Sequence, residues 1–497
     1  MAASTPIWLI GLDGASFDIL QPMFDAGKLP VLAGLMRDGA SGILKSSMAP
    51  FTPQAWATVM TGLNPGRHGV FGFVREMPGV PPEFLSLNSM KGERIWTRLG
   101  RSGRQSLIMN VPLTYPPEPL SGRLISGMMT PSVNNDFTYP LPLKDRVLSK
   151  HPNYRLDVRG GIEFSRDLSL LDELDAAVTA RAEAARDLIL EEMPDFLFLV
   201  FILPDRIQHT YCRFIHPQSA FYDSARARRW RARIWDSYTR LDRVLGELLS
   251  LAPAETNVAF ISDHGFTIER GSFSTNDFLA EVGALALKPG SARNLAKSLI
   301  RKFNVVSIKQ FVPGRLVKKT IGFTKEAIDW SKTAAYASSP QQQGIFINTR
   351  ARGAHGTVDN RDYEPWRDKI IAALAEIKHP VSGAPVVIGH RREELFSGLF
   401  LESIPDIILE FTEAGWEAKD TVLGGDPVSS FKAGTRGLHD RDGIFIAAGP
   451  AVNRGRYEGL TLEDVMPNLL AIAGVEAPAG LDGQVRPDVF NIPKERP

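Results

Sequence analysis

Carboxylate and imidazole side chains recur in four short clusters along the chain. Each cluster lies beside an apolar run that is typical of a buried β-strand. Asp and His residues that meet at the ends of parallel strands can together bind two divalent metal ions. The residues are Asp13 after the run 7–12, Asp205 and His209 after 196–203, Asp263 and His264 after 258–261, and His439 in an expected polar loop before 444–446. The sequence therefore indicates chemistry at a binuclear metal site.

Thr52 offers a hydroxyl group that such metal ions could activate as a nucleophile. It lies between Phe51 and Pro53, where the sequence predicts the start of a helix. A threonine before proline is typical of a helix N-cap, and a helix N-terminus also attracts phosphoryl oxygens. The structural and the catalytic interpretation of Thr52 are therefore compatible.

The order of these residues, together with the segment 61–69 (Thr-Gly-Leu-Asn-Pro-Gly-Arg-His-Gly), resembles the alkaline phosphatase superfamily, close to its type I phosphodiesterase/nucleotide pyrophosphatase branch. The segments around Asp205 and Asp263 look most like a group of predicted phosphohydrolases and phosphomutases. The resemblance implies two metal sites. One would be formed by Asp205, His209 and His439, and the other by Asp13, Asp263 and His264. Zn²⁺ suits these ligands, with Mn²⁺ as the alternative.

The resemblance implies a two-metal phosphoester hydrolase, above all a phosphodiesterase, in which Thr52 attacks phosphorus and forms a phospho-threonine. Phosphomutase and phosphomonoesterase are alternatives within the superfamily. A catalytically silent binding protein with the same fold is the alternative outside enzymes, and the complete ligand set argues against it. The sulfatase branch is disfavoured because Thr52 lies in no Cys/Ser-x-Pro-x-Arg motif.

One expected hydrogen-bond donor is missing from the chain. Nucleotide pyrophosphatases of this superfamily usually carry an asparagine shortly after the His-Gly pair, whereas residues 69–73 read Gly-Val-Phe-Gly-Phe. Loss of one such donor typically costs about 3 kcal/mol of transition-state stabilisation. Lys45, Asn64 and Arg67 are the candidate substrate-binding residues that could replace it. His68 is expected to be structural and to bind no metal.

Alternating helical and strand-like segments predict an α/β fold with a doubly wound, mostly parallel sheet and helices on both faces. The resemblance implies that this fold is alkaline phosphatase-like. We expect a first part of the catalytic core over residues 1–266, with an irregular binding excursion at about 112–170. An inserted cap would follow over 267–398. The second part of the core would cover 399–497, beginning with a strand at 406–411.

Composition restricts the class of protein and its partners. A hydrophobic content of 43% and a charged content of 23% are ordinary for a globular protein, and a net charge of +1 gives no general attraction to nucleic acid. Cys212 is the single cysteine, which excludes an intramolecular disulfide. The apolar runs 7–12 and 196–203 are too short for a signal peptide or a membrane span. We therefore expect a cytoplasmic protein that acts on a small-molecule phosphoester.

The segment 288–325 is basic and contains no acidic residue. It is interpreted either as a solvated face of the cap, or as a surface that captures an anionic substrate or contacts an anionic membrane. The oligomeric state is not predicted by any feature of the sequence.

Overall fold

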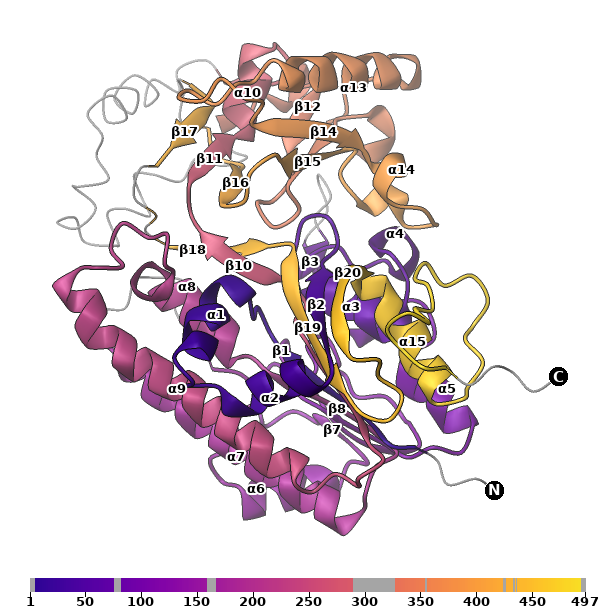
Figure 1. Cartoon of the computed structure of the whole chain (residues 1–497). Helices are drawn as coiled ribbons and strands as arrows, with labels where there is room; N and C mark the ends of the chain where they lie inside the picture. Colours follow the sequence, from indigo (N-terminus) through magenta and orange to yellow (C-terminus); the bar gives the residue numbers. More distant parts are fainter. Residues whose placement is uncertain are drawn as a thin grey trace.

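The computed structural model describes residues 5–75, 82–158, 167–288, 327–353, 355–422, 426–431, 434 and 436–492. Its centre is a nine-stranded sheet (Figure 1). In spatial order the strands are β20 (Gly455–Thr461), β2 (Ala40–Lys45), β19 (Asp442–Ala448), β9 (Asn257–Ile261), β1 (Ile7–Leu12), β8 (Phe196–Phe201), β5 (Ser106–Met109), β6 (Gly122–Ile125) and β7 (Thr138–Tyr139).

Five of the eight strand pairings in this sheet are parallel. The antiparallel ones join β19 to its two neighbours and β7 to β6. The large sheet is therefore mixed but mostly parallel, which confirms the predicted α/β class. Because β1, β8 and β9 are parallel, their carboxyl ends meet at one edge.

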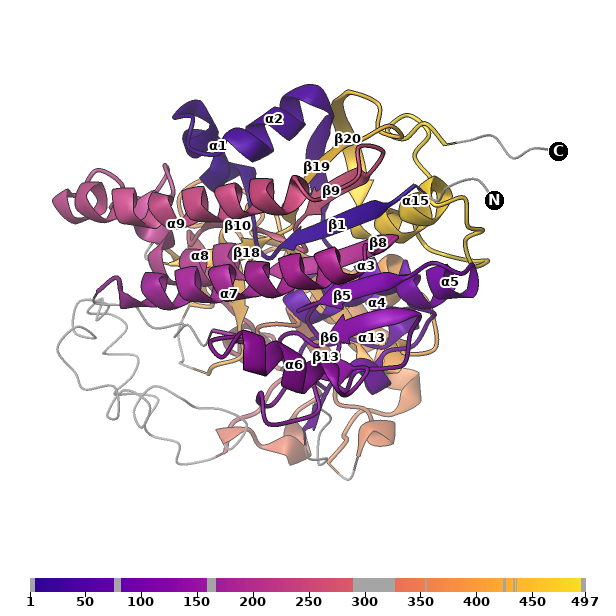
Figure 2. The same cartoon turned by 90° about the horizontal axis from the view of Figure 1, so that it is seen from below.

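The central strands are apolar on both faces because helices cover both faces. Side chains alternate between the faces, so Trp8, Ile10 and Leu12 join one hydrophobic core whereas Ile7 and Leu9 join the other. Figure 2 shows the two helical layers on either side of the sheet. One layer contains α1 (Phe17–Asp25), α2 (Pro30–Asp38), α6 (Leu143–Lys150), α7 (Ser169–Glu191), α8 (Leu203–Ile215) and α9 (Ala225–Leu249); the other contains α3 (Thr52–Thr61), α5 (Ile95–Arg101) and α15 (Val465–Ile472).

A smaller part of the molecule lies at the top of Figure 1 and has its own core and sheets. Its four-stranded sheet has the order β12 (Ala335–Ala337), β13 (Gly344–Ile347), β15 (Ile407–Phe411) and β14 (Val387–Arg391), and its three-stranded sheet the order β16 (Trp416–Lys419), β11 (Gly271–Ser274) and β17 (Val428–Ser430). The helices α10 (Thr275–Glu281), α13 (Asn360–Ala375) and α14 (Arg392–Leu395) belong to this part.

Two expectations about these segments differ from the structure. The strand at 406–411 does not resume the large sheet, because β15 pairs with β13 and β14. The pairing of β15, β16 and β17 favours an inserted region that reaches about residue 430. The excursion at 112–170 is partly regular, because β6 extends the large sheet and α6 packs on it.

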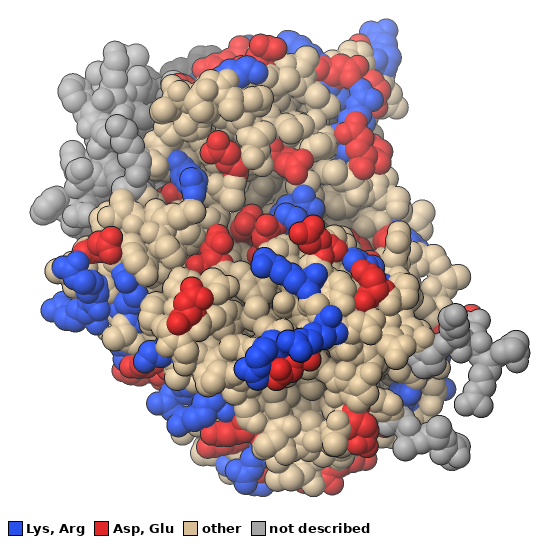
Figure 3. All heavy atoms as spheres, in the orientation of Figure 1, with Lys and Arg blue, Asp and Glu red and all other residues tan. Residues whose placement is uncertain are grey.

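Two short strands, β10 (Gly265–Ile268) and β18 (Gly437–Asp440), pair antiparallel where the chain leaves the large sheet and where it returns. The space-filling view shows acidic and basic side chains interspersed over one face, with a hollow between the upper and lower parts (Figure 3). Among the helices that the structure describes, none is both long and apolar enough to span a lipid bilayer.

Candidate active site

The carboxyl ends of β1, β8 and β9 deliver most of the expected ligands to one place. Asp13 follows β1, and Asp205 lies in the first turn of α8, four residues after β8 ends at Phe201. The two backbones are tied together because the Asp205 amide donates to the Asp13 carbonyl oxygen over 3.0 Å. His209 lies one turn further along α8, on the same side as Asp205.

Gly14 allows the chain to turn sharply after Asp13. Its φ of 68° favours glycine, and a Cβ atom there would lie 3.2 Å from Cα of Asp205. The Gly14 amide donates to Oδ1 of Asp263 over 3.1 Å. The turn thus connects the ends of β1, β8 and β9.

His439 reaches the site from the other end of the chain. The sequence predicted a polar loop at this position, but His439 lies on β18 and pairs with Phe266 of β10. Its ring stacks on that of His264 at a centroid distance of 3.7 Å. The predicted loop was wrong because a four-residue strand that pairs only with a distant segment leaves no periodic pattern in the sequence.

Asp205, His209 and His439 form one compact group, here called the cavity-side group. Oδ1 of Asp205 lies 3.3 Å from Nε2 of His209 and 3.4 Å from Nε2 of His439. The two Nε2 atoms lie 2.9 Å apart. Three ligand-type atoms thus point at one another, as they would around a metal ion.

Asp13, Asp263 and His264 form a second compact group, here called the deep group. Nε2 of His264 lies 3.4 Å from Oδ2 of Asp263 and 3.9 Å from Oδ1 of Asp13. One ligand atom from each residue lies within 4.8 Å of the others. The same holds for Asp205, His264 and His439, so His264 is close to both groups.

Each of the three carboxylates uses one oxygen for a hydrogen bond. Oδ2 of Asp13 accepts from Nε1 of Trp56 over 3.2 Å, and Oδ2 of Asp205 accepts from Nη1 of Arg206 over 2.9 Å. The remaining buried oxygens, Oδ1 of Asp13, Oδ1 of Asp205 and Oδ2 of Asp263, have no hydrogen-bond partner among the described residues. Buried carboxylate oxygens without donors are costly unless a cation compensates them, so these residues fit divalent metal ions.

Two of the histidines are oriented for metal binding through Nε2. Nδ1 of His264 lies 3.1 Å from the Gly265 carbonyl oxygen, and Nδ1 of His439 lies 3.1 Å from that of Pro50. A carbonyl can only accept a hydrogen bond, so it favours the tautomer with the proton on Nδ1. Nε2 is then left with a lone pair for a metal ion.

Burial and the charges of neighbouring side chains shift the pKa values of the residues in the two groups. Burial raises the pKa of Asp13 and Asp263 well above the usual range, and a neighbouring carboxylate adds to each shift. Burial opposes ionisation of Asp205 too, but its histidine neighbours and Arg206 hold the pKa of Asp205 well below the usual range. Burial lowers the pKa of His264 and His439, which keeps both imidazoles neutral. Neutral imidazole is the form that binds metals.

Thr52 lies beside His264 of the deep group. Its Oγ1 is 3.2 Å from Nε2 of His264. The N-cap position of α3 is occupied by Phe51, and the Thr52 side chain makes no capping hydrogen bond. The expected N-cap role therefore does not hold, because the helix starts one residue earlier than a threonine cap would require.

The site opens into a cavity of about 360 Å³ between the large sheet and the inserted region. Thr52, Asp205, His209 and His439 line it, together with the apolar side chains of Phe51, Phe73 and Met128. Phe73, in the stretch that lacks the expected asparagine, packs edge-on against Phe51 at a ring distance of 5.3 Å. The inserted region contributes Gln341, Gln343 and Trp416 to the wall.

Lys45, Asn64 and Arg67 do not line this cavity. Lys45 forms an ion pair with Asp442, and its side chain is 47% exposed. Asn64 caps α4 (Pro65–His68) and donates to Asp482, and Arg67 pairs with the same carboxylate at 3.0 Å. Asn64 and Arg67 thus attach α4 to the C-terminal segment.

His68 belongs to neither ligand group. It is fully buried, its Nε2 lies 3.1 Å from Oγ1 of Thr58, and its Nδ1 accepts from the Val70 amide over 3.1 Å. Burial lowers the pKa of His68 to about 3. Both ring nitrogens are occupied by nearby residues, Thr58 of α3 and Val70, which supports the structural role expected of His68.

Several residues at the site were not anticipated from the sequence. Arg206 follows Asp205 directly in the sequence. Its place next to a candidate ligand is the feature from which its presence at the site could have been predicted. Arg436 also lines the cavity, and its Nε donates to Glu269 over 2.9 Å. The cavity residues of the inserted region carry no recognisable motif. The basic segment 288–325 lies outside the described residues except for Lys288.

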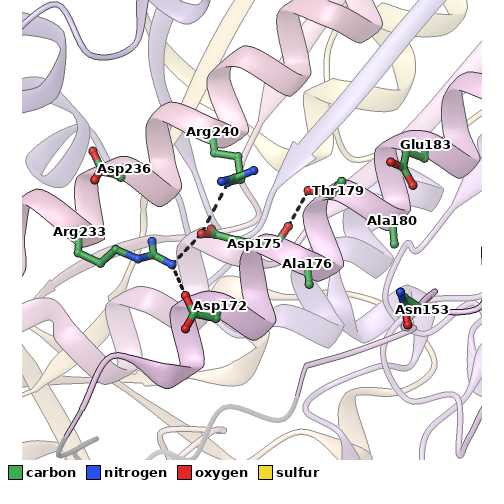
Figure 4. Close-up of a pocket in the computed structure, with 10 residues that line it drawn as sticks. All are labelled: Asn153, Asp172, Asp175, Ala176, Thr179, Ala180, Glu183, Arg233, Asp236 and Arg240. Carbon is green, nitrogen blue, oxygen red and sulfur yellow. Dashed lines mark hydrogen bonds and ion pairs between the residues drawn. The ribbon is translucent and has the colours of Figure 1, made fainter.

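A second cavity of about 670 Å³ lies between α7 and α9 (Figure 4). Its charges compensate one another, because Arg233 pairs with Asp172 at 2.7 Å and with Asp175 at 2.8 Å. Arg240 lies 3.7 Å from the same Asp175. This cavity contains neither Thr52 nor any member of the two ligand groups.

Comparison with known proteins covers the part of the chain that contains both groups. A family model described as type I phosphodiesterase / nucleotide pyrophosphatase matches residues 8–439. A search of curated proteins finds no match. The family match begins in β1, ends at His439 and includes both ligand groups, and it confirms the resemblance drawn from the motifs. The chain belongs to the type I phosphodiesterase/nucleotide pyrophosphatase family, a family of phosphoester hydrolases.

Proposed function

We propose that the protein is a two-metal phosphoester hydrolase, foremost a phosphodiesterase, with Thr52 as its nucleophile. The main support is the position of Thr52, whose Oγ1 lies 3.2 Å from Nε2 of His264 at the first turn of α3. Around it lie three buried carboxylate oxygens without hydrogen-bond donors among the described residues. A hydroxyl group beside such a cluster is suited to metal-assisted attack.

The cavity-side group and the deep group would each hold one metal ion. Zinc is the metal we propose, because imidazole and carboxylate ligands suit it, and manganese is the alternative. When bound, the two ions would lower the pKa of the Thr52 hydroxyl and compensate the negative charge of the phosphoryl group.

Thr52 would react in two displacements. In the first, Oγ1 gives its proton to solvent and bonds to phosphorus, the ester P–O bond breaks on the opposite side, and the leaving alkoxide takes up a proton from solvent to become the alcohol. In the second, water attacks the phospho-threonine, releases the phosphate product and restores the hydroxyl. The helix N-terminus of α3 favours the negative charge that develops on the phosphoryl oxygens in both steps.

The cavity restricts the kind of substrate. Its volume of about 360 Å³ is within the range of sites for small molecules. Apolar side chains such as Phe51 and Phe73 lie beside the nucleophile, so the group next to the phosphate would contact an apolar surface. Lys45, Asn64 and Arg67 remain unsupported as replacements for the missing asparagine.

The decisive experiment compares wild-type protein with Thr52→Ala in metal analysis and in nitrophenyl phosphodiester and monoester assays. Turnover should depend on Thr52, whereas both proteins should bind metal. Thr179→Ala, on the far side of the large sheet in α7, serves as the matched threonine control and should behave like wild type.

Three outcomes would redirect the proposal. Bound metal without Thr52-dependent turnover of any phosphoester or sulfate ester would contradict it and favour a binding protein. Transfer of phosphate to a second molecule without net release would identify a phosphomutase. Faster turnover of the monoester than of the diester would identify a phosphomonoesterase.

A further inference from the structure

Arg206 lies immediately beside the cavity-side group and directs its N–H groups at protein acceptors. Nη1 donates to Oδ2 of Asp205 over 2.9 Å, and Nε donates to the Val158 carbonyl oxygen over 3.0 Å. Nη2 donates to both oxygens of Asp157, over 3.0 and 3.2 Å. The planar guanidinium is therefore held in one orientation by two segments of the chain, Asp157 with Val158 and Asp205.

This contact determines which oxygen of Asp205 faces the histidines. With Oδ2 held by Arg206, Oδ1 is the atom that lies 3.3 Å from His209 and 3.4 Å from His439. Oδ1 is buried and has no hydrogen-bond partner in the described part of the chain. The carboxylate can thus offer one oxygen to a metal ion without rotating.

The deep group is oriented differently. Asp13 accepts from the indole N–H of Trp56, and Asp263 accepts from the backbone amide of Gly14. Both donors are neutral, whereas Arg206 is a cation whose charge is balanced by Asp157 as well as by Asp205. The two groups therefore have similar ligands but different supporting residues.

Arg206 is poorly suited to bind substrate itself. Although it borders the cavity, its side chain is only 17% exposed, and its Nε, Nη1 and Nη2 atoms all donate to protein oxygens. A lysine could not replace it, because a single ammonium group cannot span two carboxylates in one plane.

We propose that Arg206, anchored by Asp157, is a positioning residue that holds Asp205 as a one-oxygen ligand. It thereby sets the metal affinity of the cavity-side group independently of the deep group. This inference rests on the proposed two-metal function, because it presupposes that both groups bind metal.

The test measures zinc affinity and bound metal per chain in wild type, Arg206→Lys and Asp157→Asn, after dialysis against a chelator. In Arg206→Lys the affinity of one of the two metal ions should fall about 10- to 100-fold while that of the other is unchanged. Asp157→Asn should shift the same ion by less, because Arg206 keeps its contact with Asp205. Arg213→Lys, two turns further along α8 and outside the cavity, is the matched control.

Cobalt substitution adds a readout that a purely structural role would not change. The visible absorption of one bound Co²⁺ should change in Arg206→Lys, because a released Asp205 can offer both oxygens. Circular dichroism melting of the metal-free proteins separates this effect from misfolding. Because the Asp157 side chain is partly exposed, Asp157→Asn should fold. This variant can therefore test the role of Arg206 even if Arg206→Lys does not fold.

The outcomes separate the inference from the proposed function. Two metal ions of wild-type affinity and an unchanged Co²⁺ spectrum in both variants would overturn the role of Arg206 and leave the hydrolase proposal intact. Equal weakening of both ions in a folded variant would also overturn it, since the two groups would then not be set independently. A wild-type protein that binds no divalent metal would overturn both.

Discussion

The two ligand groups are built from the same residue types but lie in different surroundings. The side chains of Asp13, Asp263 and His264 are completely buried in the deep group. In the cavity-side group, His209 is 25% exposed and borders the cavity. The difference indicates a division of roles: the deep group is shielded by protein on all sides, whereas the cavity-side group is accessible to water and to substrate.

The pKa values of the aspartates also differ between the two groups. Burial raises the pKa of Asp13 and Asp263, whereas histidine neighbours and Arg206 lower the pKa of Asp205. Without metal, the deep group therefore tends to hold protons and the cavity-side group tends to be ionised. Metal binding to the deep group would have to displace protons, which makes its filling more dependent on pH.

Loss of a deep ligand should have the largest effect. Asp263→Asn keeps the size of the side chain but removes its charge, so the metal ion of the deep group should be lost and phosphodiester turnover should fall about 10³-fold or more. Metal analysis and steady-state kinetics measure the two effects. Wild-type metal content in this variant would contradict the assignment of Asp263.

Loss of the exposed cavity-side ligand should have a smaller effect. In His209→Gln, water can take the empty coordination position, so turnover should fall about 10- to 100-fold and recover in part when zinc is added in excess. Titration of activity with zinc tests this. If added zinc restores nothing, or if His209→Gln is as inactive as Asp263→Asn, the proposed difference between the groups is wrong.

Chelation should remove the two ions at different rates. The cavity-side ion should leave first because His209 is exposed, and the deep ion should leave slowly. An ion present at 100 times its Kd stabilises the fold by about 2.7 kcal/mol, so complete removal should lower Tm. Metal release followed with a chromophoric chelator should show two phases, and a single phase would argue against the comparison.

His68 is a buried imidazole outside both groups. Its protonation should lower the stability of the fold at acidic pH, and its substitution should leave metal binding unchanged. Its pKa is about 3 in the folded protein, against 6.5 for an ordinary histidine. Between these values the unfolded chain binds more protons, so stability falls as pH drops below 6.5, by up to about 1.4 kcal/mol per pH unit.

Urea unfolding of wild type and His68→Gln at pH 7 and pH 5 measures this contribution. The variant should lose less stability on acidification, and its metal content should equal that of wild type. Equal losses in both proteins would show that His68 titrates normally.

The neutral donor to the deep group should have the smallest effect. Trp56→Phe removes the hydrogen bond to Asp13, which is worth about 1 kcal/mol, so zinc affinity of the deep group should fall about fivefold. Competition with a chelator measures the affinity. A change at the cavity-side ion instead would contradict the assignment of Trp56 to the deep group.

The sequence alone was sufficient for the strands that carry the ligands. The runs 7–12, 196–203 and 258–261 are apolar throughout, which is typical of strands covered on both faces, and each is followed closely by Asp. Parallel strands bring such positions to one edge, so Asp13, Asp205 and Asp263 could be expected to meet. Local pattern and topology agree here, and the prediction succeeded for that reason.

The sequence was insufficient wherever the answer depended on pairing between distant segments. The strand 406–411 has the same apolar pattern whether it joins the large sheet or the inserted one. Asn64 and Arg67 looked available for substrate, but both contact Asp482, more than 400 residues away. No local feature of the sequence indicates contacts between residues so far apart.

The residue types, their order and the strand ends that carry them were determined by the sequence, because burial and strand periodicity are local properties. Only the tertiary structure decided that β18 pairs with β10 and brings His439 to Asp205, and that Arg206 spans Asp157 and Asp205. These contacts depend on the three-dimensional packing of segments far apart in the chain. That one group of candidate ligands is buried and the other borders the cavity follows from that packing.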